Sequence, residues 1–237
     1  MAGGSYAARR GELETYFDRT ASEAWARLTS DAPVSGIRAT VRAGRDQMRA
    51  TLLSWLPDDM TGLRLLDAGC GTGALANEAA RRGAQVVAID LAGTLIEHAR
   101  ERAAALGGNQ PDFRVGDMLD EELGSFDHIV AMDSLIHYRA EDIVSALAQV
   151  APRCRGSMLF TVAPRTPMLS VMHAVGRLFP RSDRAPAIEP LATGKLRRLI
   201  AAEPRLRGFR PGDDRRIRRG FYTSHAYQLA RSQGGQG

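Results

Sequence analysis

The feature that most constrains the fold is a glycine-rich turn directly after an apolar segment. Leu65 and Leu66 lead into Asp67, and glycines then occupy the alternate positions 69, 71 and 73. Glycine adopts backbone angles that other residues disfavour, so such a turn lets backbone N–H groups and a helix N-terminus approach a bound molecule closely. We therefore expect a strand, a tight turn and a helix that together bind a small molecule.

Strand and helix patterns alternate after this turn. Apolar or alternating stretches predict strands, and helical periodicity predicts the helices between them. The strands are expected at 63–69, 85–90, 112–117, 126–133, 157–162, 206–210 and 221–231, and the helices at 74–82, 93–106, 141–151 and 195–202, with an arginine-rich turn region before the last strand. Short connections of this kind predict an α/β, Rossmann-like, doubly wound and mostly parallel sheet of seven strands, with ligands at the carboxyl ends of the strands.

Two segments lie outside this alternation. Residues 1–60 are expected to form an N-terminal helical arm on a domain that spans 61–237, because the arm is too short for a core of its own. The arm includes an amphipathic helix that ends before Pro57, with apolar residues at Ile37, Val41, Met48, Leu52 and Trp55 and arginines on the opposite side at 38, 42, 45 and 49. A proline-bounded stretch at about 165–190, after the fifth strand, predicts a helical insertion. It would act as a lid on the site, contact a membrane or simply pack against the core.

Charge is distributed unevenly along the 237 residues. Residues 1–150 hold 15 basic and 22 acidic side chains, whereas 151–237 hold 17 basic and 5 acidic ones. An anionic substrate, an anionic membrane surface, RNA or a solvated arginine face would each suit the basic part. The basic residues are 31 arginines and one lysine, a bias that argues against selection for nucleic acid, since nucleic-acid-binding proteins generally use both types.

Compartment and class follow from what the sequence lacks. It has no apolar run of the ~18–20 residues that a membrane span needs and no apolar segment typical of a secretory signal, so we expect a cytoplasmic enzyme. Cys70 and Cys154 are not spaced as metal ligands, and we expect neither a disulfide framework nor a metal site.

Asp67 discriminates between two kinds of cofactor. Gly69, Gly71 and Ala74 also satisfy the pattern of dinucleotide-binding proteins, so a nicotinamide oxidoreductase is an alternative. A carboxylate two residues before the first glycine would repel a pyrophosphate, but it attracts a ligand that carries a positive charge. The turn therefore favours a cationic ligand.

Two further acids end neighbouring strands of the predicted sheet. Asp90 closes the strand at 85–90, where a carboxylate can accept hydrogen bonds from both ribose hydroxyls. Asp117 follows the strand at 112–117 in the sequence Gly116-Asp117-Met118, where a carboxylate beside a backbone N–H can bind the edge of an adenine. Because parallel strands end at one edge of the sheet, we expect these acids and the glycine turn to form one site.

The motifs around Asp67, Asp90 and Asp117 resemble those of class I S-adenosylmethionine-dependent methyltransferases over residues 62–162. The strand at 221–231 fits the antiparallel last strand of that family. The resemblance implies a role in cofactor binding for several residues. The turn would hold the methionine part through Asp67, Gly69, Cys70, Gly71 and Gly73, and Asp90 with Leu91 would hold the ribose. Asp117 with Met118 would hold the adenine, and Met132 adds a further contact.

Three longer stretches resemble a narrower family, the magnesium protoporphyrin IX methyltransferases of bacteriochlorophyll biosynthesis. They are residues 16–49, the segment AMDSLIHY at 131–138 and the insertion APRTPMLSVMHAVGRLFP at 163–180. The resemblance implies methyl transfer to a propionate carboxylate of magnesium protoporphyrin IX, with magnesium present only as part of the substrate. It also implies contact with a magnesium chelatase subunit or peripheral association with a membrane surface, and no nucleic acid partner. Another small acid or a quinone precursor is the alternative substrate.

The candidate catalytic residues are His137 and Tyr16. A propionate is already ionised at pH 7, so the reaction needs no general base. His137 follows the fourth strand, where it would hydrogen-bond the propionate or ligate the substrate's magnesium, unless it is a packing residue. Tyr16 resembles the family's N-terminal tyrosine and would line the porphyrin, although packing within the arm explains it equally well.

Overall fold

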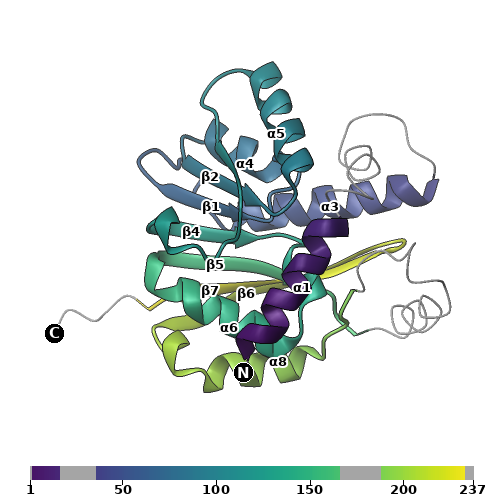
Figure 1. The fold of residues 1–237 in the computed structure, drawn as a ribbon, viewed down its shortest axis with the longest axis vertical. Helices are drawn as coiled ribbons and strands as arrows, with labels where there is room; N and C mark the ends of the chain where they lie inside the picture. Colours follow the sequence, from purple (N-terminus) through teal and green to yellow (C-terminus); the bar gives the residue numbers. More distant parts are fainter. Residues whose placement is uncertain (1, 17–35, 166–187, 233–237) are drawn as a thin grey trace.

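The computed structural model describes residues 2–16, 36–165 and 188–232. Its centre is one seven-stranded sheet with the order β3-β2-β1-β4-β5-β7-β6 (Figure 1). The strands are β1 (Arg64–Ala68), β2 (Gln85–Asp90), β3 (Asp112–Val115), β4 (Phe126–Ala131), β5 (Cys154–Val162), β6 (Phe209–Arg219) and β7 (Tyr222–Arg231). β7 is antiparallel to both neighbours, and the pairs among β1 to β5 are parallel. The predicted mostly parallel α/β sheet with an antiparallel last strand is confirmed.

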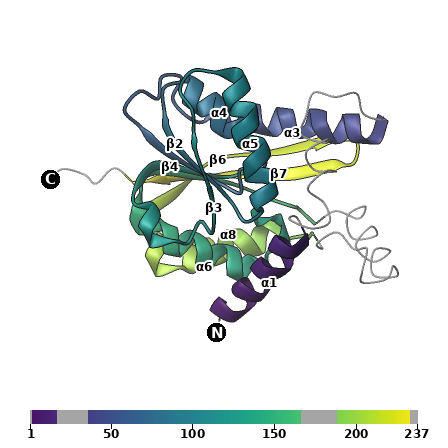
Figure 2. The same cartoon turned by 45° about the horizontal axis from the view of Figure 1, so that its top comes forward.

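Helices cover both faces of the sheet. They are α1 (Ala2–Tyr16), α3 (Gly36–Ser54), α4 (Ala74–Arg81), α5 (Gly93–Leu106), α6 (Ala140–Val150) and α8 (Thr193–Ala202), with the 3-10 turns η2 (Glu121–Leu123), η3 (Leu135–His137), η4 (Ala151–Arg153) and η6 (Pro204–Leu206). Figure 2 shows α3, α4 and α5 on one face and α1, α6 and α8 on the other. Each face buries its own apolar cluster.

Burial confirms the predicted apolar periodicity of α3 at two of its positions. Met48 and Leu52 are fully buried against the sheet, and the helix packs on β6 and β7. Gly44 allows this close approach, because a Cβ at that position would lie 2.5 Å from Cδ1 of Tyr222 on β7. α3 therefore contributes to the core of the domain.

The prediction of an arginine-rich turn region before the last strand is wrong. Those residues belong to β6, which is a single strand from Phe209 to Arg219 and pairs with β7 along that length. Pro211 and Gly212 obscure the strand in the sequence, and a register shift between Pro211 and Asp214 accommodates them. β6 is an edge strand in which only Phe209 and Ile217 are buried, and its exposed arginines are Arg210, Arg215, Arg216, Arg218 and Arg219.

The predicted lid insertion at 165–190 lies mostly outside the described residues. At its two ends, Pro164 and Leu191 form an isolated bridge, and the backbone N–H of Glu189 donates to the carbonyl of Ile136 at 2.9 Å.

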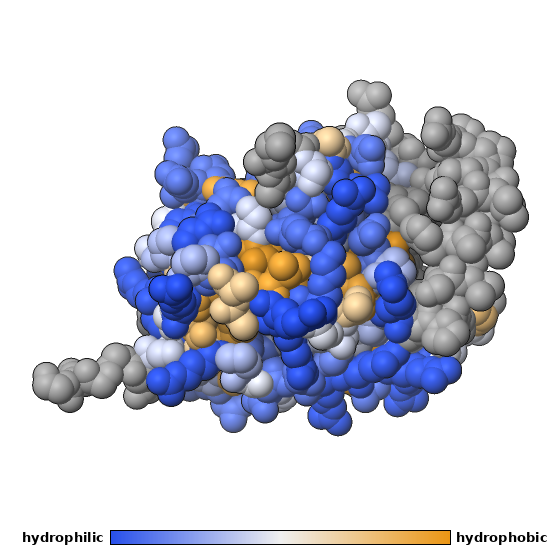
Figure 3. Space-filling view, turned by 90° about the horizontal axis from the view of Figure 1, so that it is seen from below, coloured by the Kyte–Doolittle hydropathy of each residue, from blue (hydrophilic) through white to orange (hydrophobic). Residues whose placement is uncertain are grey.

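The surface seen from the side of α6 and α8 is mainly hydrophilic, with a smaller apolar area in the middle of the view (Figure 3). Among the helices that the structure describes, none has the length and apolar character required to span a membrane.

Candidate functional site

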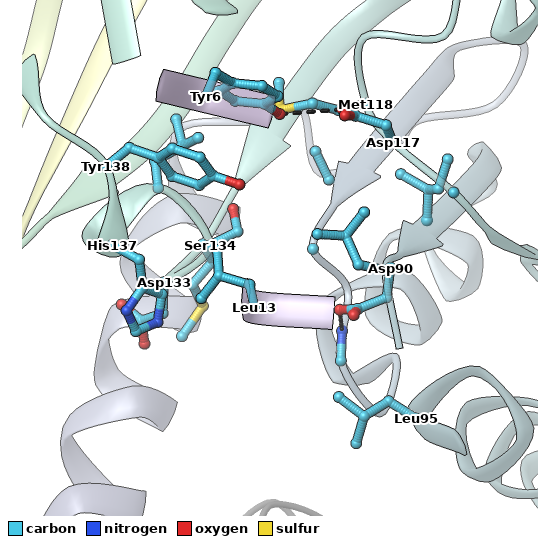
Figure 4. Close-up of a pocket in the computed structure, with 18 of the residues that line it drawn as sticks. Tyr6, Leu13, Asp90, Leu95, Asp117, Met118, Asp133, Ser134, His137 and Tyr138 are labelled. Carbon is cyan, nitrogen blue, oxygen red and sulfur yellow. Dashed lines mark hydrogen bonds between the residues drawn. The ribbon is translucent and has the colours of Figure 1, made fainter. Parts of the chain in front are cut away.

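A pocket opens at the carboxyl ends of the central strands. Its empty volume is about 780 Å³, including space open to solvent. The glycine turn after β1, the ends of β2 and β3, the segment after β4 and one side of α1 form its walls (Figure 4). The predicted site residues that line it are Gly69, Gly71, Asp90, Leu91, Asp117, Met118, Met132 and His137. The topology thus brings together residues from four separate strand ends.

The glycine turn is held against the neighbouring strand ends. The N–H groups of Gly69 and Cys70 both donate to the carbonyl of Ile89, at 2.8 and 3.0 Å. Gly69 has a φ of +79°, and a Cβ there would collide with Cβ of Ser134 after β4. The turn needs glycine at position 69 for both its backbone angle and its close approach to Ser134.

Among the predicted site residues of the turn, Cys70 and Gly73 do not belong to the pocket wall. Gly73 has a φ of +75° and precedes α4, and a Cβ there would lie 2.7 Å from the Phe113 ring. Gly73 therefore sets the packing of α4 against the sheet. Cys70 is half-buried, and burial raises the pKa of its thiol well above the usual value, with a further contribution from Asp67. The thiol is consequently neutral and unsuited to act as a nucleophile.

Asp67 lies beneath the turn and is nearly inaccessible to solvent. Burial, together with the nearby charge of Asp90, raises its pKa to about 7. Its Oδ2 atom has no hydrogen-bond partner among the described residues. A buried acceptor without a partner is costly, and a ligand that brings a donor or a positive charge to the turn would offset that cost.

The pKa of Asp67 predicts an unusual dependence of stability on pH. Below pH 7 the folded protein keeps this carboxyl protonated, whereas the unfolded chain ionises it near pH 4, so stability falls as pH rises between these values. Asp67→Asn, which stays neutral, should therefore gain in unfolding free energy relative to the wild type between pH 5 and pH 8. Urea unfolding at both values measures this, with Asp112→Asn at the exposed start of β3 as the control. An Asp67→Asn difference that does not change with pH would contradict the assignment.

Asp90 connects the end of β2 to the glycine turn. Its Oδ2 accepts a hydrogen bond from the N–H of Gly71 at 2.8 Å, and its Oδ1 accepts one from the N–H of Ala92 at 3.0 Å. Burial raises the pKa of the carboxyl, while these hydrogen bonds oppose the rise. Each carboxylate oxygen can accept a second hydrogen bond, so Asp90 is able to brace the turn and bind ligand hydroxyls in the pocket.

The N-terminal helix α1 contacts the site through Asp117. The Tyr6 hydroxyl donates to Oδ1 of Asp117 at 3.0 Å, and Arg10 forms an ion pair with Oδ2 at 3.1 Å. The Tyr6 ring stacks on Tyr138, with ring centroids 4.7 Å apart. Burial raises the pKa of both tyrosines well above 10. Figure 4 shows Tyr6 and Asp117 at the same end of the pocket.

Sequence reasoning did not identify Tyr6 as a site residue. Tyr6, Arg10 and Leu13 have the i, i+4, i+7 spacing of one helix face, and Tyr6 and Leu13 both line the pocket. This helical spacing is the sequence feature from which Tyr6 could have been identified as a site residue. Arg9 adds a contact from the same turn of the helix, because its Nε donates to the carbonyl of His137 at 3.0 Å.

The two candidate catalytic residues have different positions. His137 ends η3, lines the pocket and is 8% exposed. Tyr16 is the last residue of α1, is half-buried and is not part of the pocket wall in the described structure. Partial burial raises the pKa of its hydroxyl. The structure therefore places His137 with the predicted cofactor residues and Tyr16 outside them.

A buried polar cluster adjoins the pocket after β4. Asp133, with a φ of +55°, accepts hydrogen bonds from the hydroxyls of Thr161, Tyr222 and Ser224, at 3.1 to 3.3 Å. Its Oδ2 also forms an ion pair with Arg45 of α3 at 3.1 Å. Both Asp133 and Arg45 line the pocket. The helical pattern placed Arg45 on the polar side of α3 and gave no signal for this contact.

Comparison with known proteins identifies similar chains. Residues 131–231 match the family model described as the magnesium-protoporphyrin IX methyltransferase C-terminus, and residues 65–155 match a general methyltransferase domain. The chain is 49% identical over 229 residues to a magnesium-protoporphyrin O-methyltransferase of Rhodobacter capsulatus, an alignment that covers 94% of this chain and 97% of the relative. A protein of the same name from Synechocystis is 29% identical, with 79% and 83% covered.

A solved structure supports the same relationship. The crystal structure of magnesium protoporphyrin IX methyltransferase from Synechocystis with bound SAH superposes with a TM-score of 0.81 at 26% sequence identity. The superposition covers 94% of this chain and 99% of that chain. The similarity therefore extends over nearly the full length of both chains.

Proposed function

The chain belongs to the magnesium-protoporphyrin O-methyltransferase family, and on this premise we propose how its pocket performs the family's reaction. The reaction is S-adenosylmethionine-dependent methyl transfer to magnesium protoporphyrin IX. We infer that the acceptor is a propionate carboxylate and that the product is the monomethyl ester. The observation that carries this proposal is the convergence of Asp90, Asp117 and the glycine turn on one pocket at the strand ends.

The pocket residues fit S-adenosylmethionine, which supplies an electrophilic methyl group when bound. Asp90 would hold the ribose hydroxyls, and Asp117 with Met118 would hold the adenine. Gly69 and Gly71 would receive the methionine part, and the unpartnered Oδ2 of the buried Asp67 favours a positively charged group near the turn. Leu91 and Met132 add apolar wall, while Cys70 and Gly73 shape the turn from outside the pocket.

A carboxylate acceptor removes the need for a general base in the pocket. The propionate is ionised at pH 7, so no proton needs to be removed before methyl transfer. Burial raises the pKa values of Tyr6 and Tyr138, so both stay protonated and neither supplies a phenolate base. Catalysis then depends on alignment of the carboxylate oxygen with the methyl group, and alignment can supply ~7–11 kcal/mol.

His137 and Tyr16 are proposed as substrate-contacting residues. His137 would hydrogen-bond the propionate or ligate the substrate's magnesium, since it lines the pocket beside the end of β4. Tyr16 would contact the porphyrin from the end of α1, outside the cofactor part of the pocket. These roles require no proton transfer.

We expect His137→Gln to retain more activity than His137→Ala. If His137 makes a positional hydrogen bond, its loss in the alanine variant lowers kcat/KM by about 3- to 10-fold, in line with ~0.5–1.5 kcal/mol for one neutral hydrogen bond. The glutamine amide keeps one polar contact. Methylation kinetics measure both variants, and His98→Gln, on the exposed side of α5, is the control. A loss of ~10²–10⁴-fold in both variants would instead indicate general base catalysis.

Magnesium ligation by His137 makes a separate prediction for the wild type. Metal-free protoporphyrin would then be the poorer substrate, and the preference for the magnesium form would shrink in His137→Ala. Equal use of the two porphyrins by the wild type would exclude ligation and leave the hydrogen bond.

The experiment that tests the proposed function is a methylation assay with labelled S-adenosylmethionine. The substrates are magnesium protoporphyrin IX, its dimethyl ester and a quinone precursor. Transfer of label to the free acid and not to the dimethyl ester would support a propionate acceptor. Label in the quinone precursor and not in any porphyrin would overturn the proposal in favour of a quinone methyltransferase.

The proposal extends to partners and location. A flat, largely apolar porphyrin is poorly suited to free diffusion in water, which favours direct transfer from a magnesium chelatase subunit or from a membrane surface in the cytoplasm. The basic composition of residues 151–237 supports contact with an anionic surface. Co-sedimentation with vesicles that contain anionic or only neutral lipids tests the membrane part, and equal binding to both would contradict it.

A further inference from the structure

The pocket wall contains more carboxylates than cationic side chains, although the reaction involves anionic groups. Among the described residues that line it, Asp90, Asp117 and Asp133 are carboxylates, and Asp67 is buried just behind the turn. Arg45 is the lone arginine or lysine in that lining. S-adenosylmethionine carries a carboxylate at its methionine end, and magnesium protoporphyrin carries propionates. A carboxylate that enters this pocket is repelled unless a cation compensates for the acids.

Arg45 is fixed in place from two sides. Gly44 lets α3 approach Tyr222 so closely that a Cβ at position 44 would lie 2.5 Å from the tyrosine ring. Asp133 then forms an ion pair with Nη1 of Arg45 at 3.1 Å. The Arg45 side chain is 18% exposed, whereas that of Asp133 is 3% exposed. The guanidinium is therefore the more accessible partner of the pair.

Asp133 is itself held by neutral donors. The hydroxyls of Tyr222, Ser224 and Thr161 all donate to its carboxylate, and its own N–H donates to Oγ1 of Thr161 at 2.7 Å. A buried ion pair often adds no net stability compared with apolar side chains. The ion pair between Asp133 and Arg45 nevertheless lies at the pocket wall, and Asp133 has a φ of +55°. A buried ion pair at this place, on a strained backbone, indicates a role in binding.

We propose that Arg45, positioned by Asp133, binds a carboxylate of one of the two reactants in the methyl transfer. The inference rests on the proposed function, because it identifies the ligand groups from that reaction. A guanidinium has several N–H donors in one plane, a geometry that suits a carboxylate. The group that it binds is the methionine carboxylate of S-adenosylmethionine or a propionate of the porphyrin. Analogues that lack one or the other carboxylate distinguish these two possibilities.

The test compares ligands in pairs for the wild type and Arg45→Gln. Calorimetry gives the affinity for S-adenosylmethionine and for its decarboxylated analogue, and fluorescence gives that for magnesium protoporphyrin IX and for its dimethyl ester. We expect Arg45→Gln to weaken binding of the carboxylate-bearing member of one pair by about 10- to 100-fold. Binding of the member without that carboxylate should change by less than about two-fold. The affected pair identifies the ligand group.

Arg49→Gln is the matched control. It removes the same charge one turn further along α3, where Arg49 pairs with Asp46 and does not line the pocket, and it should alter none of the four affinities. The proposal would be overturned if Arg45→Gln lowered the affinity for both members of each pair equally. It would also be overturned if the variant lowered the affinity for no member of either pair.

A second variant allows for loss of folding, because Arg45→Gln leaves Asp133 buried without its cation. Arg45→Gln with Asp133→Asn removes both charges, and it should show the same selective loss. Methylation of magnesium protoporphyrin by the wild type, measured with the same preparation, tests the proposed function separately. Activity in the wild type without a selective loss in the variants would refute the role of Arg45 alone.

Discussion

Replacing Asp90 with alanine is expected to weaken S-adenosylmethionine binding by about 100-fold or more, with the fold retained. A hydrogen bond to a carboxylate contributes ~1.5–3 kcal/mol, and the variant loses the proposed contact with the ribose. It also frees the N–H groups of Gly71 and Ala92, which Asp90 now holds at 2.8 and 3.0 Å. The glycine turn therefore loses a support in addition to the ligand contact. Titration calorimetry measures the affinity.

Two further variants sharpen this prediction. Asp90→Asn keeps one carbonyl oxygen as an acceptor and should lose less affinity than Asp90→Ala. Asp112→Ala removes a carboxylate at the opposite end of a neighbouring strand, where it is half-exposed and paired with Arg114, and should leave the affinity unchanged. An Asp90→Ala protein that binds the cofactor as tightly as the wild type would remove Asp90 from the site.

Gly69→Ala is expected to reduce methylation by about 100-fold or more. The added Cβ would collide with Cβ of Ser134, so the segment after β4 has to move, and with it Asp133 and His137. A displacement of the reacting or positioning groups by ~1 Å is sufficient for a loss of activity of this size. Steady-state kinetics and calorimetry together show whether the loss lies in cofactor affinity, in turnover or in both.

A glycine elsewhere in the chain separates the collision from backbone strain. Gly62 has a φ of +78°, nearly the same as the +79° of Gly69, but a Cβ there would meet no atom within 4 Å. Gly62→Ala should therefore reduce stability modestly and leave kcat/KM unchanged. Adding Ser134→Gly to Gly69→Ala removes the colliding atom and should restore part of the activity. Failure of this double variant to recover, with equal losses at the two glycines, would show that strain is the cause.

Local patterns were sufficient to predict the repeating part of the fold. The bounds of β2 at 85–90 and of α5 at 93–106 coincide with those expected from the sequence. Here one face of each element is apolar with the appropriate period, and glycine, proline or acidic residues mark the ends. The convergence of Asp90 and Asp117 on one edge of the sheet also followed, because parallel strands present their carboxyl ends together.

Contacts between distant parts of the chain were not predictable in this way. Tyr6 meets Asp117 across 111 positions of sequence, and no helical pattern specifies where a face of α1 will dock. Arg45 has the spacing of an exposed arginine on α3, but its ion pair depends on how α3 crosses β7 and the end of β4. Both residues lie at the pocket because of tertiary packing, which overrides the local interpretation of an amphipathic helix.

The arginines of β6 also affect how one molecule meets another. β6 pairs with β7 on one side, and within the described structure no strand pairs with its other side. An open edge exposes backbone donors and acceptors that can extend the sheet into a second molecule, which is a route to aggregation. Five exposed arginines and a register shift lie along this strand, and like charges on two such edges repel each other. These five arginines therefore disfavour edge-to-edge pairing of two molecules, an effect that requires no ligand.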